Sequence, residues 1–386
     1  MIRRAADGPR EVMFAHSSTI YGGMEIYVER VLAGLDRDRW SPALFLTLDA
    51  YAVPAEFVAH VRELEVPIVG QQPSHLERTS AEAARIWSLV RAVRRRRSAL
   101  VHVNTAEPDK PRMPFAAATI ARTPILRTDH LPPDPAQLTK GLRHNVHLLD
   151  AVTRQVVLVS EANRDAHIRL LGRNPNKLLV LHNGIELGRL VTADDRAAAK
   201  RALSLDPALP LVGTVGRLHE QKGHRDLILA MRSVIDRRGH SNLAIVGAGP
   251  LEGEMRALAV SLGIGASLIM PGHVRDPALW VSAFDVAVLP SLYEGFSLSM
   301  LEFMAAGKPC VFSDHASFVE ATDGGRVARL ARVGDPDSLA DGIVGLLIDP
   351  SVAEALGHAA RAHVKKYFTI DAHVRRLMDL YDATAR

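Results

Sequence analysis

Residues 210–231 read "PLVGTVGRLHEQKGHRDLILAM" and contain one complete strand, loop and helix unit. The short apolar run at the start is typical of a buried strand, and the run after Gly223 repeats apolar residues at helical spacing. The strand ends at Gly216, and the loop that follows carries Arg217 and Lys222. A chain built from many such units is expected to form a mostly parallel sheet covered by helices.

The same alternation extends in both directions from this stretch and restarts near residue 209. A chain of 386 residues is long enough for two hydrophobic cores. The pattern therefore predicts an α/β protein with two Rossmann-like domains, at residues 1–188 and 189–366. Ligands of such domains bind at the carboxyl ends of the strands. Residues 367–386 are expected to form one last amphipathic helix.

Composition excludes several classes of protein. With 47% hydrophobic and 23% charged residues the chain is expected to be globular. The single cysteine, Cys310, rules out an internal disulfide and a cysteine-based zinc cluster. Neither a signal peptide nor an apolar run of about 18 residues is present. We therefore expect a cytoplasmic protein that does not span a membrane.

A basic run, Arg94, Arg95, Arg96 and Arg97, ends a predicted helix. These cations complement the helix dipole while facing water, or they contact an anionic membrane surface or an acidic acceptor. Both interpretations stay open, with peripheral membrane contact as an expectation to test. No aromatic side chains interleave the charges, so nucleic-acid binding is not expected.

The loop with Arg217 and Lys222 suits a diphosphate, because two cations and a helix N-terminus all favour an anion. Surface charge is the alternative explanation. The glycines in "LAIVGAGPLEGEM" half-match a dinucleotide fingerprint, but the last spacing is one residue too long and Pro250 interrupts it. A nicotinamide or flavin enzyme is therefore not expected.

Other candidates are weaker when taken alone. Gly22 and Gly23 stand between a strand and a helix, where glycine lets backbone N–H groups approach a phosphate. His130 follows a strand, where it is either a ligand-binding or a structural histidine. The pairs Asp36/Asp38 and Asp335/Asp337 look like turns and caps, so no metal site is expected.

The stretch "YEGFSLSMLE", residues 293–302, places Glu294 on a loop and Glu302 eight positions later on a helix. Ser299 and Glu302 also match a capping box, which gives Glu302 a purely structural alternative. Glu294, by contrast, precedes the helix N-terminus, where it would meet a bound ligand.

Taken together, the motifs resemble the retaining glycosyltransferases of family 4, glycosyl transferases group 1, over almost the whole chain. The matching stretches are "YGGME", "LRTDH", "VVLVSEANRD", "LLVLHNGIE", "GTVGRLHEQKG", "LAIVGAGP", "MPGHV", "LPSLYEGFSLSMLEFMAAGKPCV" and "LMDLY". The resemblance implies the GT-B fold, with two Rossmann-like domains facing across a deep cleft. It also implies that the helix at 367–386 packs back on the N-terminal domain.

The resemblance implies roles for individual residues. Arg217 and Lys222 would neutralise the diphosphate of a nucleotide-sugar in place of a metal ion. Glu302 would bind the ribose, Glu294 the donor sugar or its phosphate, and His130 the transferred sugar. The remaining donor contacts implied are at Gly22, Gly23, Gly216, Val274, Gly295, Phe296, Ser297 and Leu298.

The reaction implied is transfer of a hexose-type sugar, most commonly from UDP, to an acceptor hydroxyl with retention, without metal or other cofactor. Residues 130–146 are expected to grip a lipid-linked sugar, a polysaccharide or a small natural product. A nucleotide-sugar epimerase and a catalytically silent nucleotide-sugar-binding protein are the alternatives. Two departures from the family pattern affect the substrate: Asn104 replaces a frequent second histidine, and "SDHASFVEATDGG" lacks a frequent Gly-Gly.

Overall fold

The computed structural model describes residues 8–17, 20–47, 53–69, 78–106, 108–110, 112–188 and 196–386. The chain divides into two compact units. Unit 1 comprises Met1–Asn183 and Ile370–Arg386, and unit 2 comprises Gly184–Thr369. The boundaries expected from the sequence fall within a few residues of this division.

Unit 1 contains a parallel sheet of seven strands in the order β3-β2-β1-β4-β5-β6-β7. Its strands are β1 Arg10–His16, β2 Trp40–Leu46, β3 Ile68–Val69, β4 Leu100–Thr105, β5 Ile125–Asp129, β6 Gln155–Leu158 and β7 Leu178–Val180. Its helices are α1 Gly23–Gly34, α2 Ala55–Glu63, α3 Arg78–Arg96, α4 Met113–Ala121, α5 Lys140–Val152, α6 Glu161–Leu171 and α15 Ile370–Thr384.

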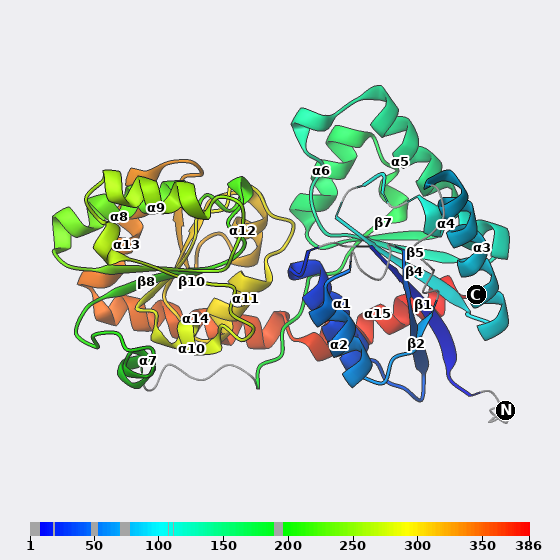
Figure 1. Ribbon diagram of the computed structural model, residues 1–386, viewed down its shortest axis with the longest axis horizontal. Coiled ribbons are helices and arrows are strands. Elements are labelled where there is room, and N and C mark those ends of the chain that lie inside the picture. Colours follow the sequence, from blue (N-terminus) through cyan, green and yellow to red (C-terminus); the bar gives the residue numbers. More distant parts are fainter. Residues whose placement is uncertain are drawn as a thin grey trace. The chain divides into compact units, whose positions relative to one another are not determined.

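The alternation of side chains along β1 shows how the helices cover this sheet. Met13 and Ala15 belong to a core cluster that also contains side chains from α3, α4 and α5. The intervening Phe14 and His16 contact Tyr381 of α15 and Phe57 of α2. Helices α3 to α5 therefore pack on one face of the sheet, and α1, α2 and α15 pack on the other, as Figure 1 shows.

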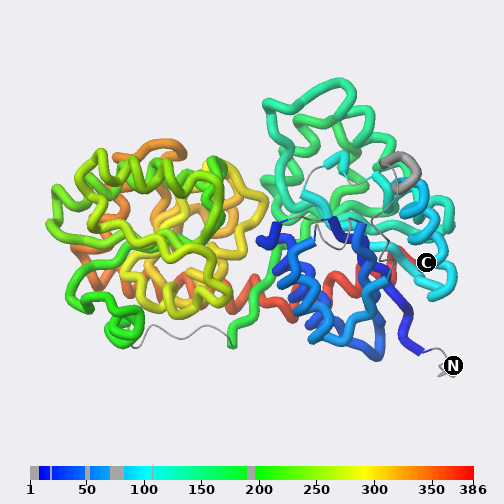
Figure 2. The backbone as a smooth tube through the Cα atoms, in the orientation of Figure 1, coloured from blue at the N-terminus to red at the C-terminus, as the bar shows by residue number. Residues whose placement is uncertain are grey.

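Helix α15 is the last element of the chain and packs within unit 1. Its Asp382 accepts hydrogen bonds from Arg39 Nε and Trp40 Nε1, both at 3.1 Å. Val374 lies against Gly34, where an added Cβ would come within 3.1 Å of a Val374 methyl carbon. The tube in Figure 2 shows this red segment next to the blue N-terminal part of the chain. The predicted return of the last helix to the N-terminal domain is confirmed.

Unit 2 contains a parallel sheet of six strands in the order β10-β9-β8-β11-β12-β13. Its strands are β8 Leu211–Val215, β9 Asn242–Val246, β10 Leu268–Gly272, β11 Val286–Leu289, β12 Cys310–Ser313 and β13 Arg329–Ala331. Its helices are α7 Arg196–Ala202, α8 His224–Arg238, α9 Glu252–Ser261, α10 Ala278–Ala283, α11 Leu298–Ala305, α12 Ala316–Ala321, α13 Pro336–Ile348 and α14 Pro350–Tyr367.

The main core of unit 2 joins side chains of α8, α9 and α13 to one face of this sheet. On the other face, Phe284 at the end of α10 packs edge-on against Phe303 of α11, with ring centroids 6.1 Å apart. Gly213 of β8 makes room for Phe284, since a Cβ there would lie 2.1 Å from a ring carbon. The predicted α/β class with two Rossmann-like parallel sheets is confirmed. In the part of the chain that the structure describes, no helix is both long and apolar enough to cross a bilayer.

Candidate functional site

The loop after β8 is held in place by glycines. Residues Glu220–Lys222 form a short 3-10 helix that ends at Gly223. Gly223 has φ +64°, and a Cβ there would lie 2.1 Å from the carbonyl oxygen of Pro290. Only glycine fits such a position. The loop with Arg217 and Lys222 is therefore packed directly against the segment that follows β11.

The glycines of the half-matched fingerprint support the same loop. A Cβ at Gly247 would lie 2.0 Å from the Gly216 carbonyl oxygen, and one at Gly249 would lie 2.4 Å from the Leu218 carbonyl oxygen. Leu218 N–H also donates to the Ala248 carbonyl oxygen at 3.1 Å. These glycines allow two loops at the carboxyl edge of the sheet to touch, which explains them without a dinucleotide.

Lys222 and Glu294 meet in this place. Lys222 Nζ lies 2.5 Å from Glu294 Oε1, and the Ser291 hydroxyl donates to the same oxygen at 3.0 Å. The Lys222 side chain is 16% exposed and that of Glu294 is 6% exposed. Because the sequence predicts donor-binding residues here, we call Lys222, Glu294 and Ser291, together with Arg217 from the same loop as Lys222, the donor cluster. Sequence reasoning missed Ser291, although its place two residues after a strand end was a usable signal.

The segment after Glu294 leads into α11 through a buried turn. Gly295, Phe296, Ser297 and Leu298 are all buried. Ser297 is the N-cap, and its Oγ accepts a hydrogen bond from Met300 N at 3.4 Å. The capping box considered for Ser299 and Glu302 is wrong, because α11 begins at Leu298 and Ser299 lies inside it. Glu302 lies part-buried in the second turn of α11.

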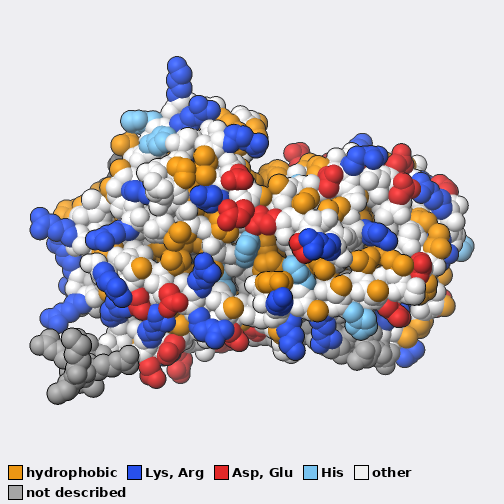
Figure 3. Space-filling view, turned by 180° about the vertical axis from the view of Figure 1, so that it is seen from behind, with side chains coloured by type: hydrophobic (Ala, Val, Ile, Leu, Met, Phe, Trp, Pro, Cys, Tyr) orange, Lys and Arg blue, Asp and Glu red, His pale blue; other side chains and the backbone are white. Residues whose placement is uncertain are grey.

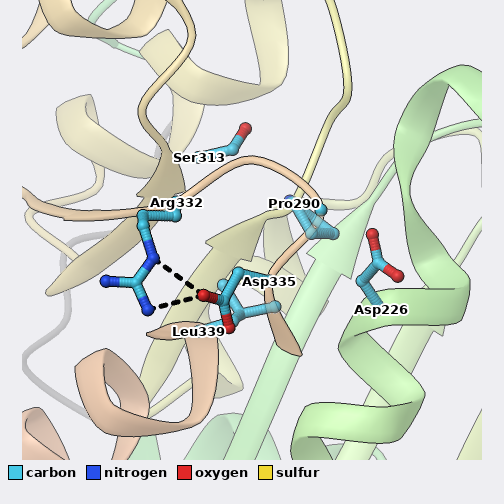
Figure 4. A pocket seen from close by; sticks show the side chains of 7 residues that line it. Asp226, Pro290, Ser313, Arg332, Asp335 and Leu339 are labelled. Atoms are coloured by element: carbon cyan, nitrogen blue, oxygen red, sulfur yellow. Dashed lines mark hydrogen bonds and ion pairs between the residues drawn. The ribbon is translucent and has the colours of Figure 1, made fainter. Parts of the chain in front are cut away.

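Val274 follows β10 and is part-buried, so it joins the other donor candidates of unit 2 at the carboxyl edge of this sheet. A small hollow at this edge lies beside Pro290 and Ser313, and its wall also includes Asp226 and Asp335. Figure 4 shows Arg332 and Asp335, which both line it, joined by an ion pair. None of the donor-binding candidates from the sequence lines this hollow.

In unit 1, His130 lies directly after β5 at the carboxyl edge of the sheet. Its Nε2 is 3.1 Å from Asn104 Oδ1, and its ring packs edge-on against Tyr27, with centroids 4.6 Å apart. Burial lowers the pKa of His130 to about 4, so the ring is neutral at pH 7. Asn104, which replaces the second histidine frequent in the family pattern, thus contacts His130 directly.

Gly22 and Gly23 lie at the start of α1, at the same edge of the sheet as His130. The Gly22 N–H donates to Glu25 Oε2 at 2.9 Å, and Glu25 Oε1 is 3.1 Å from His16 Nε2. The Gly22 N–H is thus already used within the protein. A Cβ added at Gly23 would meet no heavy atom of the described residues within 4 Å.

A buried ion-pair network includes Arg127 and Asp129 of β5, the strand that His130 follows. Arg173 donates to Asp150 through Nε at 2.8 Å and Nη2 at 2.6 Å, and to Asp129 through Nη1 at 2.6 Å. Arg127 Nε donates to the other Asp129 oxygen at 2.5 Å. Burial alone would raise the pKa of Asp129, but Arg127 and Arg173 outweigh it and the pKa is lowered. We call these four residues the closed network.

The arginine run at the end of α3 is only partly available to solvent. Arg96 Nη2 lies 2.7 Å from Glu11 Oε2, and Arg94 Nη2 donates to the Ile120 carbonyl oxygen at 2.8 Å. Arg95 and Arg97 are exposed. The face drawn in Figure 3 shows cationic and hydrophobic side chains interspersed over the surface. Among the described residues, no group of three or more His, Cys, Asp or Glu side chains is placed to hold a metal ion.

Known protein families match both halves of the chain. Residues 21–189 match the family model "Glycosyltransferase Family 4", and residues 209–349 match "Glycosyl transferases group 1". The chain belongs to glycosyltransferase family 4. The family predicted from the sequence motifs is confirmed, and with it the enzyme class of the domains.

Two curated relatives illustrate the range of the family. The chain is 29% identical over 235 residues to a lipopolysaccharide core biosynthesis mannosyltransferase of Rhizobium meliloti. The matched segment covers 58% of this chain and 66% of that protein. It is 31% identical over 214 residues to a D-inositol 3-phosphate glycosyltransferase of Corynebacterium jeikeium. That match covers 53% of this chain and 51% of the relative. The chain thus spans about half to two thirds of the length of these relatives.

Solved structures share the fold of this chain. HepE of Anabaena, solved in complex with UDP and glucose, superposes with a TM-score of 0.84 at 20% identity, covering 97% of this chain and all of that one. The sucrose-phosphate synthase of Thermosynechococcus elongatus gives a TM-score of 0.78 at 20% identity, covering 97% and 98%. The predicted GT-B fold is confirmed by these neighbours.

Proposed function

We propose that this family 4 protein transfers a hexose-type sugar from a nucleoside-diphosphate sugar to an acceptor hydroxyl, with retention at the anomeric carbon. The observation that carries the proposal is the ion pair of the donor cluster, in which Lys222, from the loop that also carries Arg217, meets Glu294. A part-buried cation stabilises a developing diphosphate charge far better than an exposed one, because little water screens it.

The proposed step needs no metal ion. The bond between the anomeric carbon and the β-phosphate oxygen breaks, and the acceptor oxygen bonds to that carbon from the same face. The acceptor proton passes to the departing phosphate oxygen. Arg217 and Lys222 would hold the charge that grows on the diphosphate, while Glu294 orients Lys222 and meets the sugar end of the donor. Chelation with EDTA is then expected to leave turnover unchanged.

We propose UDP as the nucleotide of the donor, with uracil as its base. HepE supports this choice because it was solved with UDP. GDP is the alternative nucleotide, because a relative from Corynebacterium glutamicum is GDP-mannose-dependent. The acceptor class stays broad: a lipid-linked sugar, a polysaccharide or a small natural product. Relatives that act on a lipopolysaccharide core or on an inositol phosphate are compatible with this range.

The test is a screen of UDP- and GDP-sugars without acceptor, followed by chromatography of the products. Slow release of free sugar and nucleoside diphosphate is the expected result. Conversion of one nucleotide-sugar into its epimer, without release of nucleoside diphosphate, would establish the epimerase alternative instead. Binding without any turnover, even with acceptors added, would support the silent binding protein.

We also propose that the end of α3 contacts an anionic membrane surface. Arg95 and Arg97 are exposed there, and Trp87 of the same helix is 52% exposed. Cations near an anionic surface contribute about 1 kcal/mol each. Co-sedimentation with phosphatidylglycerol vesicles should fall with added salt and in Arg95→Glu/Arg97→Glu. The control is Arg376→Glu on α15, which packs on the other face of the sheet and should leave binding unchanged.

A further inference from the structure

His315 lies at the edge of the donor cluster, two residues after β12. It precedes α12 in the N-cap position, but its side chain makes no capping hydrogen bond. Its Nδ1 is 3.2 Å from the Ser317 hydroxyl. Its Nε2 is buried and has no hydrogen-bond partner among the described residues. The ring as a whole keeps part of its surface exposed, so it lies at the border of the core.

The contacts of Ser317 decide the protonation of this ring. The Ser317 hydroxyl donates to the Glu294 carbonyl oxygen at 3.2 Å. A hydroxyl has only one proton, so towards His315 the same oxygen must accept. The proton of the ring therefore sits on Nδ1. Burial lowers the pKa of His315 to about 4, which leaves Nε2 as a bare acceptor at pH 7.

An acceptor nitrogen without a partner is costly in a buried place, and a ligand with a donor group removes that cost. Phosphate oxygens carry no donor at neutral pH, and the Nε2 lone pair would repel them. Sugar hydroxyls are donors. His315 is linked through Ser317 to Glu294, which we have placed at the sugar end of the donor. The chemistry of this position therefore matches the sugar and excludes the diphosphate.

We propose that His315 is a specificity-determining residue of the donor site, and that its Nε2 accepts a hydrogen bond from one hydroxyl group of the transferred sugar. Ser317 is a positioning residue that fixes the proton on Nδ1. The stretch "SDHASFVEATDGG", where the chain departs from the frequent Gly-Gly pattern, thus acquires a function. This inference rests on the proposed function, because it assumes a nucleotide-sugar in the donor cluster.

The experiment compares His315→Phe, which keeps a ring but removes the acceptor, with His315→Gln, which offers an amide oxygen. Calorimetry measures the affinities of UDP, UDP-glucose, GDP and GDP-mannose for each protein. We expect His315→Phe to weaken the nucleotide-sugar by about threefold to tenfold, the range of one hydrogen bond, and to leave the nucleoside diphosphate unchanged. His315→Gln should restore part of the loss. His358→Phe, on an exposed position of α14, is the matched control.

A series of deoxy-sugar donors identifies the hydroxyl. One deoxy analogue should bind the wild type more weakly than the parent donor, and His315→Phe should no longer distinguish the two. An equal loss for nucleoside diphosphate and nucleotide-sugar, or unchanged discrimination among all deoxy analogues, overturns the inference. If the wild type binds no nucleotide-sugar at all, the proposed function fails as well. If the wild type binds the nucleotide-sugar and His315→Phe binds it equally well, the inference about His315 fails and the proposed function stands.

Discussion

Each unit carries a group of charged side chains that contact one another, but the two groups are built differently. In the closed network of unit 1, the Arg173 and Asp129 side chains are 0% and 2% exposed, and each meets opposite charges within the fold. In the donor cluster of unit 2, Lys222 is 16% exposed and the cluster borders the bare nitrogen of His315. Opposite charges that are buried against one another thus serve stability, whereas a charge that stays partly exposed is left available to a ligand.

Removal of Arg173 should have the largest effect. Arg173→Ala leaves Asp129 and Asp150 buried with fewer opposite charges, and we expect a loss of about 3 to 5 kcal/mol in the free energy of unfolding. Urea denaturation measures it. The control is Arg164→Ala, whose exposed pair with Glu161 should contribute less than about 0.5 kcal/mol. If both variants lost the same small amount, the closed network would not be a stabilising element.

If Arg173→Ala proves too unstable to purify, Arg173→Lys keeps the charge but loses the double contact with Asp150. It should fold with a smaller loss, and its residual donor turnover per folded molecule should stay near that of the wild type. A strong loss of turnover with little loss of stability would reverse the assignment of the two regions.

Removal of Lys222 should act on turnover instead. Lys222→Met takes away one cation from the developing diphosphate charge, and we expect kcat to fall by about 10²- to 10³-fold. Lys365→Met on the exposed surface of α14 is the control. Because Lys222→Met also leaves Glu294 unpaired, the double variant Lys222→Met/Glu294→Gln should recover any lost stability but no activity. Full activity in either variant would remove the donor cluster from the reaction.

A substitution at Gly247 tests how the donor cluster is held. Its φ is +148°, and a Cβ would collide with the Gly216 carbonyl oxygen. Gly247→Ala should therefore cost about 1 to 3 kcal/mol and displace the loop with Arg217. Thermal unfolding together with the KM for the nucleotide-sugar measures both effects. Gly253→Ala, where a Cβ meets no heavy atom within 4 Å, should change neither.

The last expected effect is a change of stability with pH, which concerns a buried histidine of unit 1. Burial lowers the pKa of His102 to about 3 in the folded state, against about 6.5 when unfolded. The unfolded chain therefore takes up a proton that the folded chain does not, and stability falls as pH drops from about 6.5 towards 3. His102→Gln should lower the slope of unfolding free energy against pH by up to about 1.4 kcal/mol per unit. Urea titrations between pH 4 and 7 check it, and an unchanged slope would contradict it.

Much of the donor cluster could be predicted because its residues lie in short motifs of the sequence. Arg217 and Lys222 stand in one loop, and Glu294 stands before one helix, so spacing and loop position are informative. Ser291 and Ser317 could not be assigned in this way. Their roles come from hydrogen bonds to Glu294 across three and 23 positions of the chain. The place of Ser291 after a strand end indicates the edge of the sheet, but it does not indicate which side chain the hydroxyl meets.

The error at Ser299 has a similar cause. The sequence has two serines near the start of α11, and the capping-box pattern pointed to Ser299. Ser297 caps the helix because the buried turn at Gly295 and Phe296 sets where helical backbone begins. Within residues 130–146, which were expected to bind the acceptor, α5 begins at Lys140. Thr139 Oγ1 caps it by accepting from Leu142 N at 3.0 Å, a signal that was present in the sequence.

By itself, the sequence determined the alternation of strands and helices, the family and the loop that carries Arg217 and Lys222. Each of these depends on short spacing, on apolar periodicity or on a motif, and all are local properties of the chain. The tertiary structure alone decided that Lys222 pairs with Glu294, that Arg173 joins Asp129 to Asp150, and that His315 keeps one nitrogen bare. These depend on which distant segments pack together, because burial and charge pairing arise only when the chain is folded.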